Sequence, residues 1–167
     1  MKKLKYFFVV LALGLFTTAC EYDTFEDELP FIENALPAYV RFDPGISASI
    51  NLDEGAVRDL EVQVTAPIQQ DVTVTYSISG NAVFGQNFII SGAQANGGTF
   101  TIEHKQDDPA NFDNFVITVI ALDDRLRDGD KNLTITLESA VAADGTVLQA
   151  GQGSVYKTVN ITIVDTN

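Results

Sequence analysis

The chain has 167 residues, and its 23 acidic residues outnumber the ten basic ones. All the acidic residues follow Cys20, together with seven of the basic ones, so the part after Cys20 carries a formal net charge of −16. This balance argues against a nucleic-acid-binding protein, because phosphate recognition depends on clustered lysine and arginine. It also argues against electrostatic adsorption to anionic lipid. The length suits one domain rather than two.

The first twenty residues have the layout of a bacterial export signal. Three lysines precede an apolar run from Tyr6 to Phe16, which is too short to span a bilayer, and small residues then lead to Cys20. These small residues resemble a lipobox, although Thr17 replaces the usual aliphatic residue. Cys20 is the only cysteine, so it has no intramolecular disulfide partner. We expect residues 1–19 to be a cleaved lipoprotein signal peptide and Cys20 to carry a covalent lipid that anchors the protein to the outer membrane. The alternative is an ordinary signal beside a structural cysteine.

Residues 20–37 form a predicted tether, which begins with the lipidated cysteine. The segment is rich in acidic residues, has no apolar period and contains Pro30 and Pro37. It is interpreted either as a flexible, solvated spacer or as a surface-export signal, since acidic residues after a lipidated cysteine resemble such signals in some Gram-negative bacteria. The domain that follows is expected to be either periplasmic or surface-exposed.

From Ala38 onward, apolar and polar residues alternate in short runs rich in β-branched side chains. A period of two places one face of each run in a core and the other in solvent, as in a half-buried antiparallel strand. Turn-forming residues such as Asp43-Pro44-Gly45 and Asp144-Gly145 separate the runs. The predicted strands cover residues 38–42, 46–52, 60–65, 72–78, 100–103, 115–120, 133–137 and 159–164.

These runs predict an all-β fold in which two antiparallel sheets of about seven to nine strands pack into a sandwich. No stretch after the signal shows a helical period over three turns. The chain contains no tryptophan and lacks the Cys…Trp…Cys pattern, so it is not an antibody-type domain.

The order of several short motifs resembles the Calx-beta family. Asp53-Glu54-Gly55 precedes one strand, Gly80-Asn81-Ala82 begins a segment that ends at Asn87-Phe88, Asp123-Asp124 follows a strand, and Asp165 comes near the end. The resemblance covers roughly Val40 to Asn167 and implies that residues 38–167 form an immunoglobulin-like sandwich. Family members occur in sodium–calcium exchangers, integrin chains and bacterial surface proteins, and in some of them the loops at one end bind calcium.

The resemblance also implies a calcium site, because five carboxylates fall on family ligand positions: Glu54, Asp123, Asp124, Asp128 and Asp165. Calcium takes about 6–8 oxygen ligands in irregular geometry. Three positions depart from the family pattern, since Asn87 and Asn167 stand for aspartate and Lys131 stands for glutamate. An ammonium group at a ligand position competes with the ion, so we expect a weak or vestigial site.

A simpler interpretation of the same loop is turn chemistry. Counting from Asp128, the sixth residue is Leu133 rather than glycine and the twelfth is Ser139 rather than glutamate, so the loop is not an EF-hand. Asp128-Gly129-Asp130 then forms a turn, and Asp123-Asp124 ends a strand. Apart from the lipid and this calcium site, the sequence indicates no cofactor.

Catalytic signals are weak. His104 is the only histidine and follows a predicted strand, where a solvated loop residue is expected, and the chain offers neither a Cys–His pair nor a His–Cys zinc site. We therefore expect a non-catalytic binding, adhesion or structural module, with the membrane as one partner and a surface protein or glycan as another. The alternative is a hydrolase, such as a glycosidase, that uses two loop carboxylates. Aromatic-lined sugar clefts usually contain tryptophan, which is absent here.

Overall fold

The structure, a computed structural model, describes residues 38–64, 68–105, 112–153 and 155–166. The predicted signal peptide, Cys20 and the acidic linker lie outside these residues, as does Asn167. The part of the chain that the structure describes has no helix long and apolar enough to cross a membrane.

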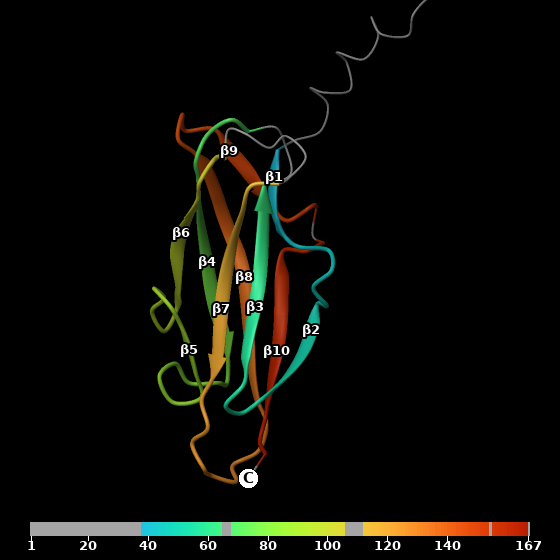
Figure 1. Cartoon of the computed structure of the whole chain (residues 1–167), viewed down its shortest axis with the longest axis vertical. Helices are drawn as coiled ribbons and strands as arrows, with labels where there is room; N and C mark the ends of the chain where they lie inside the picture. Colours follow the sequence, from blue (N-terminus) through green and yellow to red (C-terminus); the bar gives the residue numbers. More distant parts are fainter. Residues whose placement is uncertain (1–37, 65–67, 106–111, 154, 167) are drawn as a thin grey trace, which may run out of the picture. The chain divides into compact units, whose positions relative to one another are not determined.

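The described residues form ten strands, so the all-β class is confirmed (Figure 1). This is one strand above the predicted range, because the short segments 88–90 and 147–150 were not among the predicted strands. The ten strands are β1 Tyr39–Phe42, β2 Ser49–Asp53, β3 Val57–Val64, β4 Val72–Gly80, β5 Phe88–Ile90, β6 Gly97–Ile102, β7 Asn114–Ala121, β8 Lys131–Ala142, β9 Val147–Ala150 and β10 Thr158–Val164.

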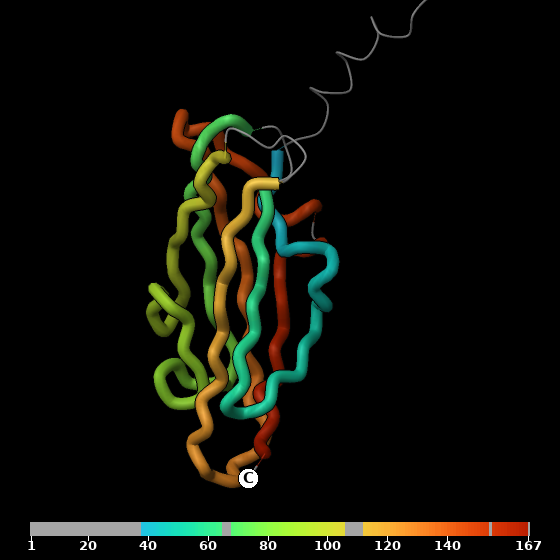
Figure 2. The backbone as a smooth tube through the Cα atoms, in the orientation of Figure 1, coloured from blue at the N-terminus to red at the C-terminus, as the bar shows by residue number. Residues whose placement is uncertain are grey.

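The strands form a sandwich of two layers (Figures 1 and 2). One layer has the order β2-β10-β8-β4-β6, and the other has the order β1-β3-β7-β5. Strand β9 joins the two layers, because it pairs with β8 along one edge and with β1 along the other. Strand β9 therefore closes part of one lateral side by hydrogen bonds, and the rest of that side ends in β2, which pairs only with β10. The opposite side ends in β5 and β6.

The N-terminal strands cross from one layer to the other. Strand β1 pairs with β3, whereas β2 pairs with β10 in the other layer. The crossing begins at the predicted turn, where the carboxylate of Asp43 accepts a hydrogen bond from the backbone N–H of Gly45 at 2.6 Å. Most strand pairs are antiparallel as predicted, but β1–β9 and β2–β10 are parallel.

The core lies between the layers and follows the predicted alternation. On β8, for example, Leu133, Ile135 and Leu137 are at most 1% exposed, and the residues between them face outward. Burying one aliphatic side chain of this size contributes about 1.5–3 kcal/mol. The same packing fixes the ends of the strands, and thereby the loops that carry the polar residues considered next.

Candidate functional site

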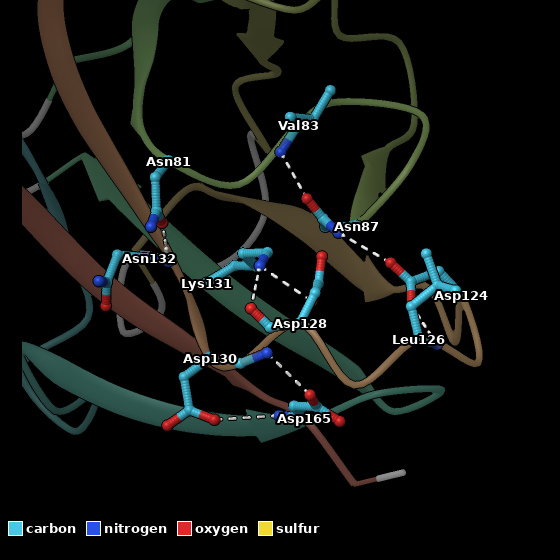
Figure 3. Close-up of polar contacts among 11 residues, drawn as sticks. Asn81, Val83, Asn87, Asp124, Leu126, Asp128, Asp130, Lys131, Asn132 and Asp165 are labelled. Atoms are coloured by element: carbon cyan, nitrogen blue, oxygen red, sulfur yellow. Dashed lines mark hydrogen bonds and ion pairs between the residues drawn. The ribbon is translucent and has the colours of Figure 1, made fainter.

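Four strand ends bring the predicted calcium ligands to one end of the sandwich. Glu54 follows β2, Asp123 and Asp124 follow β7, Asp128 precedes β8, and Asp165 follows β10. The backbone N–H of Glu54 donates to the carbonyl of Val164 at 3.2 Å, which joins the ends of β2 and β10. The structure thus places all five carboxylates at this acidic end, part of which is drawn in Figure 3.

Three of the other carboxylates act on Glu54. Partial burial raises the pKa of Glu54 above its ordinary value of 4.5, and the charges of Asp124, Asp165 and Asp123 raise this pKa further, while a hydrogen bond with the Thr166 backbone opposes them. Desolvation and like charges both disfavour the ionised form of a carboxyl group. The acidic end therefore stores electrostatic repulsion around Glu54.

This repulsion predicts a pH dependence that depends on Glu54. The folded protein binds a proton at Glu54 more tightly than the unfolded chain does, so the free energy of unfolding falls as the pH rises from 4.5 through the raised pKa. Glu54→Gln removes that titration. We expect the melting temperature of the variant to decline less than that of the parent between acid and neutral pH.

Asp144, in the β8–β9 turn, serves as a control for Glu54 because its pKa is shifted in the opposite direction. Hydrogen bonds from Gln70 and from Thr146 lower the pKa of Asp144 below its ordinary value of 3.8. Its contribution to stability is present above that value and is lost as the pH falls through the lowered pKa. Asp144→Asn should therefore reduce the loss of stability in acid, and equal pH profiles for the two variants would contradict both assignments.

Asp128 is engaged by Lys131 and does not join the group around Glu54. The Lys131 ammonium lies 2.9 Å from the Asp128 carboxylate and donates at 2.9 Å to the backbone carbonyl of the same residue (Figure 3). The lysine side chain is only 19% exposed, so this contact is partly shielded from solvent. An ammonium group thus occupies the position that the family pattern gives to a carboxylate.

Asn87, directly before β5, contacts Val83 and Asp124 at the acidic end. Its side chain is buried, accepts a hydrogen bond from the Val83 backbone N–H at 2.9 Å, and donates to the Asp124 carboxylate at 3.3 Å (Figure 3). The amide group therefore satisfies a loop N–H and one carboxylate at once. An aspartate here could accept the first hydrogen bond but could not donate the second.

Two further residues were not among the sequence predictions. The Asp130 carboxylate accepts a hydrogen bond from the Asp165 backbone N–H at 3.1 Å, while the Gly129 N–H donates to the Asp165 carboxylate at 2.9 Å. Asn81 accepts a hydrogen bond from the Asn132 backbone N–H and so joins the end of β4 to the start of β8. The only sequence signal for either residue is its place beside a glycine turn.

These contacts determine which carboxylate oxygens could coordinate calcium. Calcium requires several oxygen ligands directed at one point, whereas Asp124 and Asp128 face nitrogen donors of Asn87 and Lys131. Within the described ranges, no group of three or more His, Cys, Asp or Glu residues is arranged to hold a metal ion. As the side chains lie, they brace the loops rather than form an oxygen cage.

Known proteins resemble this chain in fold but not in sequence. No family model matches the chain, and no curated protein matches it in sequence. Among solved structures, the chain is similar to the CBD2 domain of Calx, with a TM-score of 0.50 and 12% identity over 77% of this chain and 87% of that domain. The chain has a Calx-beta-like β-sandwich fold. At this identity the likeness concerns the fold alone.

Two other solved structures resemble the chain with TM-scores below 0.5, which is too low to support a fold assignment. One is to a cohesin module from a family 33 glycoside hydrolase of Clostridium perfringens, with a TM-score of 0.40 and 7% identity over 77% of this chain and 96% of the module. The other is to domains 4 and 5 of the S-layer protein SbsC, with a TM-score of 0.34 and 11% identity over 77% of this chain and 51% of that chain. The Calx-beta-like assignment therefore depends on the CBD2 domain.

His104 lies away from the acidic end and has a structural contact. Its imidazole Nδ1 is 2.8 Å from the carboxylate of Asp113, and the same carboxylate accepts a hydrogen bond from the Lys105 backbone N–H at 3.0 Å. His104 lies in a loop, as predicted, but its side chain is only 22% exposed and connects the end of β6 to the start of β7 in the Calx-beta-like domain.

Proposed function

We propose that the protein is a lipid-anchored, extracytoplasmic and non-catalytic module that binds or supports another surface component. The observation that carries this proposal is the way the acidic end is held. Lys131 binds Asp128, Asn87 binds Asp124, and a backbone N–H binds Asp165. A hydrolase needs a carboxylate directed at its substrate, whereas Asp124 and Asp165 connect separate segments and Asp128 is held within its own loop.

We further infer that the domain is a divergent Calx-beta member with a weak calcium site. The order of the sequence motifs and the likeness to the CBD2 domain of Calx support this assignment. Lys131 supplies part of the positive charge that an ion would otherwise provide, because its ammonium group neutralises Asp128. The partner is a surface protein or a glycan. The lipid on Cys20 holds the domain near the outer membrane, where it meets this partner.

The anchor gives the most direct test of the proposal. Cells grown with labelled palmitate should incorporate the label into this protein, and Cys20→Ala should abolish the label and release the domain from the membrane fraction. The physical reason is that two or three acyl chains hold a protein on a membrane stably, whereas the acidic domain itself is not attracted to anionic lipid. Gel autoradiography and fractionation measure both effects.

Two outcomes would contradict the proposed function. Persistent labelling of the Cys20→Ala variant would rule out lipidation at this cysteine. Turnover of glycosides, esters or peptides that disappears in Asp123→Asn or Asp124→Asn would favour the hydrolase instead. Turnover that persists in both variants would come from a contaminating enzyme, and equal loss in Asp144→Asn, at a turn between other strands, would reflect a general loss of folding.

A further inference from the structure

A groove of about 420 Å³ lies on the open lateral side of the sandwich, between β6 and β7. This volume falls within the range of protein sites that bind ligands, about 300–1,000 Å³. None of the lining residues is charged, although the chain as a whole is strongly acidic. The lining includes Tyr76, Gly92, Phe100, Phe115, Val116 and Thr118.

The β7 wall of the groove is an open strand edge. Strand β5 pairs with β7 only from Val119 to Ala121, because the chain leaves this layer at the turn after Ile90, where Gly92 has a φ of +76°. Residues 114–118 of β7 therefore have no neighbouring strand on that side among the described residues. Figure 1 shows β5 beside only the lower part of β7.

The backbone direction of this edge follows from two printed hydrogen bonds. The Ala121 N–H donates toward β3, to Ala56, and the Leu122 N–H donates toward β5, to Asn87. Successive residues of a strand point their N–H groups in alternate directions. The N–H groups of Val116 and Thr118 therefore point to the groove side.

Neither wall carries the usual protection of an edge. Natural proteins block open strand edges with charged residues, proline or bulges, because such edges pair with other chains. Strand β6 has the sequence Gly-Gly-Thr-Phe-Thr-Ile and pairs only with β4, and residues 114–118 of β7 read Asn-Phe-Val-Ile-Thr. Both sequences lack charge and proline, and β6 pairs with β4 in an unbroken register.

The floor of the groove is aromatic. The rings of Phe100 and Phe115 stack with their centroids 4.3 Å apart, and Tyr76 lies 5.8 Å from Phe100. Phe115 is 36% exposed and Val116 is 44% exposed, so a substantial apolar surface faces solvent here. An added strand would cover Phe115 with its inward side chains.

We propose that this groove binds an extended peptide segment of another protein, which adds a strand to β7 in line with β5. The segment is uncharged over about five residues, with apolar side chains at alternate positions, because the lining is uncharged and strand residues alternate between the two faces. Basic residues flank it, since the charge of −16 after Cys20 repels acidic chains. A second copy of this protein carries the same charge and is disfavoured.

This inference rests on the proposed function and names the class of partner. The test uses the whole protein in lipid nanodiscs and a fluorescein-labelled, capped peptide, Lys-Lys-Thr-Val-Thr-Phe-Thr-Val-Lys. Fluorescence polarisation should show saturable binding, and amide hydrogen exchange at Val116 and Thr118 should slow when the peptide is present. Val116→Lys should weaken binding by about tenfold or more, because a lysine blocks the edge and repels the basic flanks.

Val57→Lys is the matched control, since Val57 is 57% exposed on the neighbouring strand β3 and does not line the groove. It should leave binding unchanged. Equal binding of a peptide with the same composition but its threonines and apolar residues in separate blocks would overturn the proposal. The proposal would also be overturned if amide hydrogen exchange at Val116 slowed only when the protein self-associates, or only when an oligosaccharide such as cellohexaose is added. Failure of peptide binding with palmitate labelling intact would remove this inference alone.

Discussion

Asn87→Asp combined with Lys131→Glu should make the domain depend on calcium. In chelator, we expect Asn87→Asp alone to lower the free energy of unfolding by about 3 kcal/mol, because a buried carboxylate then faces Asp124 without a donor between them. Lys131→Glu adds a second repulsion by removing the cation beside Asp128. Denaturant unfolding followed by circular dichroism measures both losses.

Calcium should reverse these losses in the double variant. Ligand linkage gives a gain of about 2.7 kcal/mol when free calcium exceeds the dissociation constant a hundredfold. Asn51→Asp is the matched control, because it adds the same charge at an exposed position on β2 and should change stability little. If the parent protein already unfolds at a much higher denaturant concentration in calcium than in chelator, Lys131 and Asn87 do not weaken the site.

Phe88→Ala should be the most destabilising single truncation near the acidic end, at about 3–5 kcal/mol. Phe88 is fully buried as the first residue of β5, and its ring packs edge-on against Phe84 with the centroids 5.6 Å apart. Its loss leaves a cavity directly beneath the loop that positions Asn87. The midpoint of denaturant unfolding measures the effect.

Ile89→Ala separates this packing effect from a general weakening of β5. Ile89 is the next residue of the strand, points outward and is 37% exposed, so we expect its truncation to cost less than about 1 kcal/mol. Equal costs at the two positions would mean that β5 is held by its backbone pairing with β7 rather than by the Phe88 side chain.

The fold could be predicted from the sequence where alternation extends over five or more residues. Strands β4, β8 and β10 have this pattern, and the predicted ranges fall on them. Strand β7 was found instead from its almost continuous run of apolar, mostly β-branched residues. Strand β5 could not be predicted, because three apolar residues have no period and its position depends on the β7 edge. The parallel pairs were also missed, since a strand's sequence does not specify which edge lies beside it.

The candidate site could be predicted in its location but not in its contacts. Family spacing placed five carboxylates at strand ends, and the structure brings Glu54 close enough to Asp123, Asp124 and Asp165 to perturb its pKa. The contact between Lys131 and Asp128 depends on the path of the loop before β8, which side-chain chemistry alone does not determine. The same is true of Asp130, because only the folded chain places it beside the end of β10.

The pairing of β1 on both edges has a mechanical consequence. The chain between Cys20 and the domain joins the sandwich at Ala38, and a pull along β1 from that point loads the strand in shear. Its hydrogen bonds to β3 and β9, including those of Gln149 N–H to Ala38 and of Gly151 N–H to Val40, lie across the pulling direction. These bonds must break together rather than one after another. A domain built in this way resists being peeled from its N-terminal end by fluid flow or by a moving partner.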